Sequence, residues 1–411
     1  MQAARSGLVR EIYLAGIGGH TPPLPTDLTA LEDAARAVLA PTAYGYAAGN
    51  AGTGATGRAN REAFDQWRLL PRMLQGAARR DLTVSLFGQR LSAPVLLAPV
   101  AAQTVVHPEG ELASVRGALD VEVPFVLSTG ASHTLEEVAA TADAGGADRA
   151  TDSIPRWFQL YWPADRAVAE SLVRRAEAKG YTALVLTVDA PSFGYRPADL
   201  DHGYLPFLNG AGIANFTSDP AFRSGLPAGA DGPAVTAHWA QVFANPTLNW
   251  EDLPWLRGLT SLPLLLKGIL HPDDARRALD LGADGVIVSN HGGRQLDGSV
   301  AALDALPSVR AAVGQSVPVL FDSGVRTGSD IVKALALGAD AILYGRPYLY
   351  GLALRGREGV AHVLRCLLAE LDLTLALTGC RSVGELAQGV LAPPGPLPVT
   401  FQAPCTEPKT R

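Results

Sequence analysis

Short apolar runs alternate with amphipathic segments of helical period along most of the chain, starting at Pro94. The runs are rich in Val, Ile, Leu and Phe, as strands of a buried parallel sheet are. Repeated pairs of strand and helix are typical of parallel βα units. Eight runs fit this pattern, at residues 95–99, 125–128, 158–161, 183–188, 264–267, 286–289, 319–321 and 341–344. Eight units can close a cylinder, so the pattern predicts an α/β fold of the (β/α)8, or TIM, barrel type.

Helix signals stand between the runs. Thr134 and Glu137 have the spacing of a capping box, and Pro272 begins a segment with two aspartates in its first turn. Three helices should end at glycines, namely Gly180, Gly282 and Gly338. Residues 165–179 predict an amphipathic helix whose apolar side covers the barrel, with Val168, Leu172, Val173 and Ala176 on that side and Arg174, Arg175 and Glu177 mostly on the other.

Three segments lie outside the repeat. Residues 1–90 predict a helical extension packed on the barrel of residues 91–392, and residues 393–411 predict an extended tail. The connection after the fourth strand, residues 190–250, is rich in Gly, Pro, Asn and Asp and is far longer than a usual βα loop. A connection of that length is typical of an active-site lid or of a disordered insertion, and both alternatives stay open.

Composition narrows the classes of function. The net charge is -6 over 411 residues and the charges are scattered, so we expect no nucleic-acid or membrane-surface partner. No stretch approaches the roughly 20 apolar residues of a spanning helix. The cysteines, Cys366, Cys380 and Cys405, are few and widely separated, which disfavours a disulfide framework and a metal site. We therefore expect a cytoplasmic protein without a metal.

One glycine pattern, at residues 52–57, matches the GxGxxG pattern of dinucleotide-binding folds. It follows no buried strand, and no βαβ unit surrounds it. The pattern therefore predicts a flexible turn instead of a dinucleotide site.

The segment from Ser289 to Gly298 carries the strongest chemical signal. His291 and Arg294 follow a predicted strand, three residues apart. An imidazole can take a proton from a substrate whose carboxylate a guanidinium holds, and the glycines between them allow a sharp turn and a close approach of a flat ligand. Taken alone, the segment could be a tight turn with a satisfied histidine.

The other strand ends favour a site. Reactive groups of a (β/α)8 barrel gather where its strands end, and the ends here carry Ser128, Gln159, Tyr161, Thr187, Asp189 and Lys267. A polar residue can merely cap a barrel, but a lysine, an aspartate and a histidine buried at one rim are costly unless paired. The last two ends, residues 322–326 and 345–347, combine glycine with arginine, which suits a phosphate.

Several separate segments, between about Glu11 and about Ala392, resemble the FMN-dependent 2-hydroxy-acid oxidases and dehydrogenases. These segments are residues 58–64, 158–161, 186–189, 266–268, 289–297 and 321–326. Within the family, residues 11–13, 46–52, 70–74, 218–222 and 271–277 are similar to the lactate 2-monooxygenases. The resemblance implies FMN as cofactor, a small 2-hydroxy acid and O2 as partners, and a homotetramer or homo-octamer.

The resemblance also implies roles for single residues. His291 would be the general base, and Asp189 would stabilise its protonated form. Arg294 and Arg196 would hold the substrate carboxylate, while Tyr46 and Tyr161 would bind the carboxylate and the α-hydroxyl. The residues implied to contact FMN are Pro99, Ala101, Ser128, Gln159, Thr187, Lys267, Ser289, Asp322, Ser323, Gly324, Arg326, Gly345 and Arg346.

At three positions the residue in this chain differs from the residue that some members of the family have. Gly130 stands where glycolate oxidase has a tryptophan, so a wall over the substrate side chain would be missing and a larger acid could enter. Ala101 resembles the plain oxidases, where the monooxygenases have glycine. Ser323 replaces a glycine and should be tolerated.

The resemblance leads to a functional hypothesis. It is the FMN-dependent oxidation of an (S)-2-hydroxy acid, L-lactate or a related, larger acid, with O2 by the oxidative decarboxylation of a lactate 2-monooxygenase. Three alternatives stay open: a simple oxidase that releases 2-oxo acid and H2O2, a dehydrogenase with another electron acceptor, and an FMN-binding barrel with no oxidase role.

Overall fold

The computed structural model describes residues 7–146 and 154–392, so the predicted tail at 393–411 lies outside the described residues. Eight parallel strands close a barrel in chain order, and the last pairs with the first. They are β4 (Val95–Leu97), β5 (Phe125–Ser128), β6 (Arg156–Tyr161), β7 (Leu184–Thr187), β8 (Leu264–Ile269), β9 (Gly285–Val288), β10 (Val319–Phe321) and β11 (Ala341–Tyr344). The predicted barrel is confirmed, and the strand ends differ from the predicted ones by at most two residues.

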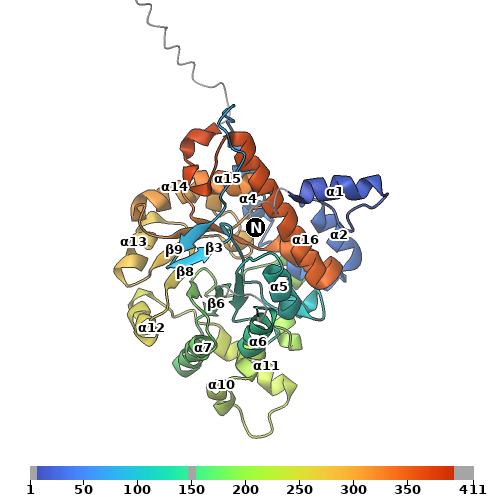
Figure 1. The fold of residues 1–411 in the computed structure, drawn as a ribbon. Coiled ribbons are helices and arrows are strands. Elements are labelled where there is room, and N and C mark those ends of the chain that lie inside the picture. The colour runs from blue at the N-terminus through green and yellow to red at the C-terminus, as the bar shows by residue number, and fades with distance from the viewer. Residues whose placement is uncertain (1–6, 147–153, 393–411) are drawn as a thin grey trace, which may run out of the picture.

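An outer layer of helices surrounds the barrel (Figure 1). These helices are α5 (Gly110–Leu119), α6 (Leu135–Gly146), α7 (Arg166–Ala178), α12 (Leu253–Leu259), α13 (Pro272–Asp280), α14 (Ala302–Val313), α15 (Gly328–Ala336) and α16 (Arg346–Thr378). The capping box before α6 is confirmed, since the Glu137 N–H donates to Thr134 Oγ1 and the Thr134 N–H donates to the Glu137 carboxylate. The three predicted helix-ending glycines all have positive φ.

The sequence predicts a helical N-terminal extension, but the structure contains strands in this extension as well as helices. It begins with α1 (Gly7–Ile17), α2 (Leu31–Val38), α3 (Pro41–Ala48) and α4 (Ala55–Asp65), but strands follow. β1 (Arg68–Leu69) pairs with β12 (Leu391–Ala392), and β2 (Val84–Leu86) forms a hairpin with β3 (Gln89–Leu91). The hairpin covers the end of the barrel where the strands begin, because the Phe87 ring packs against Trp157 at 5.9 Å between centroids.

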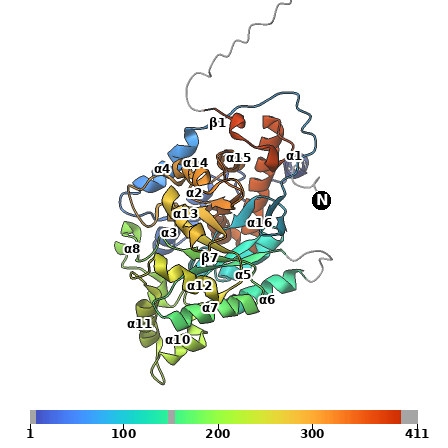
Figure 2. The same cartoon turned by 90° about the vertical axis from the view of Figure 1, so that its left-hand side faces the viewer.

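Residues 190–250 form a set of short helices on one side of the barrel, in place of a bare loop (Figure 2). The helices are α8 (Pro197–Leu200), α9 (Ala214–Thr217), α10 (Pro220–Ser224) and α11 (Gly232–Phe243), with 3-10 turns η3 (Pro206–Asn209) and η4 (Trp250–Asp252). An aromatic cluster lies inside this insertion, where Trp239 stacks on Phe207 and Phe243 at 5.0 and 4.7 Å between centroids. The alternative of a disordered insertion is therefore wrong.

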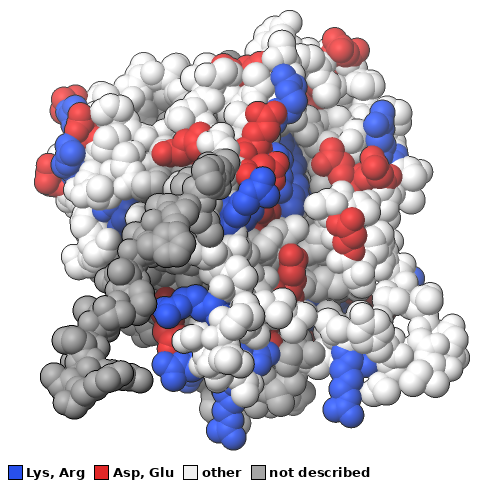
Figure 3. All heavy atoms as spheres, turned by 90° about the horizontal axis from the view of Figure 1, so that it is seen from above, with Lys and Arg blue, Asp and Glu red and all other residues white. Residues whose placement is uncertain are grey.

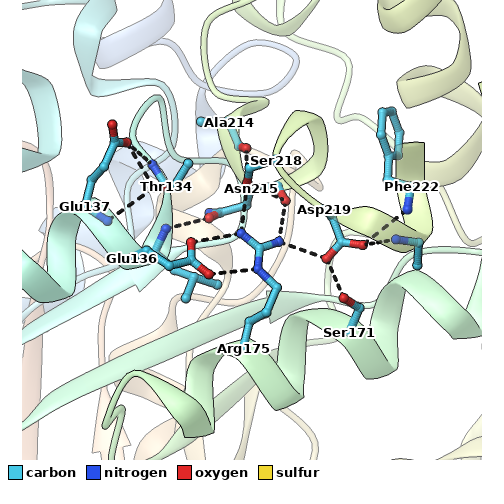
Figure 4. Close-up of polar contacts among 12 residues, drawn as sticks. Thr134, Glu136, Glu137, Ser171, Arg175, Ala214, Asn215, Ser218, Asp219 and Phe222 are labelled. Carbon is cyan, nitrogen blue, oxygen red and sulfur yellow. Dashed lines mark hydrogen bonds and ion pairs between the residues drawn. The ribbon is translucent and has the colours of Figure 1, made fainter. Parts of the chain in front are cut away.

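A partly buried polar network joins the insertion to the outer helices (Figure 4). Arg175 of α7 donates to both oxygens of Glu136 at 2.9 Å and to Asp219 Oδ2 at 2.8 Å. Asp219 is fully buried and also caps α10, while the fully buried Asn215 accepts the Leu135 N–H at 2.8 Å. Arg175 therefore faces the insertion, which corrects its predicted place on the solvent side of α7. A buried carboxylate is costly unless paired, so this contact holds the insertion in place.

The surface carries charges of both signs. Figure 3 shows basic and acidic side chains interspersed on one face. Among residues 7–146 and 154–392, no helix has both the length and the apolar character needed to cross a membrane.

Glu111, in the first turn of α5, is a fully buried carboxylate. Its Oε1 accepts the Gln103 N–H at 3.2 Å and the Ser132 N–H at 3.1 Å, so it joins the connections that follow β4 and β5. Its Oε2 has no hydrogen-bond partner among the described residues. Burial raises the pKa of the Glu111 carboxyl to about 7, and the backbone N–H groups oppose this effect only in part.

We predict that Glu111 makes the protein less stable as the pH rises from 4.5, the ordinary pKa of the group, to about 7. In this range the folded state keeps a proton that the unfolded state has released. Glu111→Gln cannot ionise, so it should lose this part of the pH dependence and gain stability relative to the wild type at high pH. Thermal unfolding of both proteins at about pH 5 and about pH 8 measures the effect. An equal difference in Tm at the two pH values would contradict the assignment.

Candidate active site

A cavity opens at the end of the barrel where the strands terminate, and we call it the mouth cavity. Most of the predicted site residues line it, from strand ends, the N-terminal extension and the insertion. They are Tyr46, Pro99, Ala101, Tyr161, Thr187, Arg196, Lys267, His291, Arg294, Asp322, Ser323, Gly324, Arg326, Gly345 and Arg346. Closure of the barrel thus brings together residues up to 300 positions apart, from Tyr46 to Arg346.

Four predicted residues lie behind this lining and contact it through hydrogen bonds. Ser128 Oγ donates to Gln159 Oε1 at 2.9 Å, and Gln159 Nε2 donates to Thr187 Oγ1 at 2.9 Å. Ser289 Oγ accepts from Lys267 Nζ at 2.9 Å and from the His291 N–H at 3.0 Å. The fourth is Asp189, which contacts His291. These residues therefore orient groups that line the cavity.

His291 is held by a carboxylate on one side and a phenol on the other. Its Nδ1 lies 2.9 Å from Asp189 Oδ1, and its Nε2 lies 3.3 Å from the Tyr161 hydroxyl. The backbone of His291 has φ of 58°, a left-handed conformation that residues other than glycine rarely adopt. The imidazole lines the mouth cavity. Because Asp189 occupies Nδ1, Nε2 is the nitrogen that is available to a substrate.

The charges of this pair suit proton abstraction. Burial lowers the pKa of the His291 imidazole, and Asp189 offsets only part of the effect. Burial alone would raise the pKa of Asp189, but His291 and Lys267 outweigh it and hold that pKa below its usual value. The site therefore rests with a neutral imidazole beside a carboxylate. This is the arrangement of a general base whose protonated form is stabilised.

Two arginines face the same space. Arg196 Nη1 contacts Asp199 Oδ2 at 3.2 Å, and its Nε donates to the Arg294 carbonyl at 3.2 Å. Arg294 donates to the Gly49 carbonyl at 2.7 Å, and its guanidinium carbon lies 5.4 Å from the Tyr46 ring centroid. Burial, Arg196 and Arg346 together lower the pKa of Arg294 to about 9, because these like charges are close and poorly hydrated. An anion bound between these groups would relieve their repulsion.

Tyr46 and Tyr161 supply neutral donors. Burial raises the pKa of both hydroxyls, so each keeps its proton. Tyr46 donates to the Ala101 carbonyl at 3.4 Å, a long contact that a bound ligand could replace.

Lys267 and Asp322 form an ion pair at 3.0 Å on the floor of the cavity. Burial alone would lower the pKa of the Lys267 ammonium, but Asp322 and Asp189 outweigh it and raise that pKa. Lys267 therefore stays charged, which is the state needed beside a ligand that gains negative charge.

Gly130 does not line the mouth cavity, and the predicted gap in front of it is filled. A Cβ at Gly130 would lie 3.2 Å from Cε1 of Phe207, which belongs to the insertion, and 2.9 Å from the Ala101 Cβ. Phe207 thus occupies the space in front of Gly130, where the resemblance to the family implied a missing wall over the substrate side chain. Whether a larger acid can enter beside Gly130 stays a prediction.

The sequence analysis missed the aromatic wall. Phe193, Phe207 and Phe243 of the insertion all line the mouth cavity, and Gln295 lines it beside Arg294. The available signal was the presence of large aromatic residues inside a segment that is otherwise rich in Gly, Pro, Asn and Asp. Which strand ends they would reach depends on how the insertion folds back over the barrel.

Comparisons with known proteins show the family of the chain. A family model described as FMN-dependent dehydrogenase matches residues 35–393. An FMN-dependent alpha-hydroxy acid dehydrogenase of Penicillium citrinum is 44% identical over 381 residues, 91% of this chain and 92% of that protein. L-lactate oxidase of Lysinibacillus sphaericus is 43% identical over 364 residues, 89% and 92% of the two chains. The crystal structure of mandelate oxidase has a TM-score of 0.78 at 42% identity and covers 90% of this chain and 98% of its own.

The chain belongs to the FMN-dependent dehydrogenase family. Its cofactor is FMN and its class of activity is the oxidation of 2-hydroxy acids.

The residues of the mouth cavity fit FMN. Arg346 Nε is buried without a hydrogen-bond partner among the described residues, so a strong donor is left for an anion. A Cβ at Gly345 would meet only Ala98 within 4 Å, so there is open space beside this arginine. Gly324 and Arg326 line the same end of the cavity. These donors would hold the phosphate, and Lys267 would lie beside the ring system.

We predict that Arg346→Ala weakens FMN retention. The loss of charge-assisted hydrogen bonds should raise the Kd for FMN by about tenfold or more. The fluorescence of FMN released on dilution measures this, with Arg79→Ala as control because Arg79 is exposed. Arg346→Lys keeps the charge and should retain more FMN than the alanine variant. Wild-type retention in the alanine variant would exclude Arg346 from the phosphate site.

Proposed function

We propose that the enzyme oxidises an (S)-2-hydroxy acid, L-lactate or a related acid with an apolar side chain, and that O2 takes the electrons. The observation that carries this proposal is that His291, which is held by Asp189, lines one cavity together with Arg196 and Arg294. A base and a carboxylate clamp are the two groups that the reaction requires. L-lactate oxidase among the relatives supports O2 as acceptor.

In this proposal the chain's own residues bind and orient the acid. Arg196 and Arg294 hold the carboxylate, and the Tyr46 and Tyr161 hydroxyls donate to the carboxylate and the α-oxygen. His291 takes a proton from the substrate at Nε2, and Asp189 stabilises the imidazolium that forms. FMN, when bound, accepts the two electrons that leave the α-carbon.

The side-chain pocket supports an apolar substituent on the acid. Phe193, Phe207 and Phe243 line the cavity and pack on one another, with ring centroids 5.7 Å apart for Phe193 and Phe243 and 6.0 Å apart for Phe207 and Phe243. Desolvation of a methyl or larger apolar group against these rings is favourable, whereas a charged substituent would find no partner there.

We further propose that the 2-oxo acid stays bound while oxygen is reduced, as in lactate 2-monooxygenase. The acid and O2 then give the carboxylic acid shortened by one carbon, CO2 and water. The ordered insertion over the cavity supports slow release of product. Ala101 favours the second candidate, a simple oxidase, in which the 2-oxo acid leaves and H2O2 is the other product.

We predict that His291→Gln keeps FMN but loses flavin reduction by the acid, by about a hundredfold or more, because glutamine cannot accept the proton. Anaerobic mixing with L-lactate, followed by loss of flavin absorbance, measures this rate. His20→Gln is the control, since His20 is exposed and does not line the cavity. Reduction at the wild-type rate in His291→Gln would remove His291 from the reaction.

The two product outcomes differ in stoichiometry. If the 2-oxo acid stays bound, we predict CO2 equimolar with the O2 consumed and little free H2O2. Simultaneous measurement of O2, CO2 and peroxide with L-lactate distinguishes the two. Peroxide equimolar with the acid consumed would reject the monooxygenase route and leave the oxidase.

A further inference from the structure

The GxGxxG segment forms a turn that leads into the first residues of α4, and several of its donors are occupied. The Thr53 N–H and Oγ1 donate to Asp297 Oδ2 at 2.6 and 2.8 Å, and the Thr56 N–H donates to Oδ1 at 3.1 Å. Asp297 belongs to the connection that carries His291 and Arg294. A side-chain carboxylate of this chain therefore occupies the helix N-terminus where a nucleotide phosphate would bind in a dinucleotide fold.

One glycine of the turn, Gly52, is needed for this approach. Gly52 has φ of +51°, and a Cβ there would lie 2.6 Å from Asp297 Oδ2. Around the carboxylate, Thr56 Oγ1 donates to the Leu296 carbonyl at 2.8 Å and accepts the Ser299 N–H at 2.9 Å. The turn thus forms hydrogen bonds with the connection on both sides of Asp297.

The same turn reaches Arg294. The Ala51 N–H donates to the Gly293 carbonyl at 2.9 Å, and Arg294 Nη1 donates to the Gly49 carbonyl at 2.7 Å. Residues 49–56 therefore contact this connection at three places. These are the Gly293 carbonyl directly before Arg294, the Arg294 guanidinium itself, and Asp297, three residues after Arg294. Arg294 therefore lies between Gly293 and Asp297, and the same turn holds both of these residues by hydrogen bonds.

We propose that Asp297 is a positioning residue for Arg294, and that its carboxylate at the N-terminus of α4 fixes the direction of the Arg294 guanidinium in the mouth cavity. The inference rests on the proposed function, in which Arg294 binds the substrate carboxylate. Hydrogen bonds from Thr53 and Thr56 lower the pKa of Asp297 to about 2, so the group stays charged in neutral solution.

The test is Asp297→Ala in the FMN-loaded enzyme. A small displacement of a binding group costs about tenfold or more, so KM for L-lactate and Kd for pyruvate should each rise by about tenfold, with a smaller change in kcat and unchanged FMN content. Asp165→Ala is the matched control, because Asp165 caps α7 in the same way, with hydrogen bonds from the Ala167 and Val168 N–H groups, and lines no part of the cavity. Asp297→Asn keeps one acceptor and should shift KM in the same direction by less.

A double mutant separates this inference from the proposed function. In an Arg294→Ala background, Asp297→Ala should add no further rise in KM, because the group that it positions is gone. A repeated tenfold rise in that background would overturn the inference, as would an Asp297→Ala enzyme that behaves like Asp165→Ala. If Arg294→Ala alone leaves KM unchanged, the proposed carboxylate site fails instead.

Discussion

Positive charge gathered at one end of the barrel is the constraint on which the site depends. Lys267, Arg196, Arg294, Arg326 and Arg346 all line the mouth cavity. The lowered pKa of Arg294 shows the cost of holding these groups close together with little water. Two anions, a cofactor phosphate and a substrate carboxylate, would balance this charge. The fold therefore selects its ligands first by charge.

Two carboxylates at the cavity each pair with a different basic side chain. Asp322 pairs with Lys267 on the floor, and Asp189 pairs with His291 at the rim. Asp322 and Asp189 keep the Lys267 ammonium charged by raising its pKa. Burial keeps the His291 imidazole neutral by lowering its pKa, and Asp189 offsets only part of that effect. The base His291, directly after β9, and the charged Lys267 of the neighbouring strand β8 can therefore face one cavity in different protonation states.

The insertion after β7 gives the cavity its apolar wall and its rigidity. Its aromatic residues pack on one another, while Arg175, Asn215 and Asp219 attach its middle part to the outer helices. Because the attachment is buried and charged, displacement of the insertion would expose an unpaired carboxylate. In the proposed reaction, this segment contributes both to the choice of substrate and to the retention of product.

The sequence by itself determined the barrel and the chemistry of its strand ends. Periodic apolar runs specify strands and helices locally, and residues such as His291 and Lys267 follow directly from where those strands stop. The family resemblance added Arg196 and Tyr46, which do not directly follow a barrel strand in the sequence.

Only the tertiary structure decided how the irregular segments fold over that frame. The Phe207 wall in front of Gly130, the ion pair of Arg175 with Asp219 and the contact of Asp297 with the glycine turn all join residues distant in sequence. No local periodicity encodes such contacts, because they depend on the packing of whole elements. The hairpin β2–β3 was missed for the same reason, since strands this short acquire their stability from the barrel end that they cover.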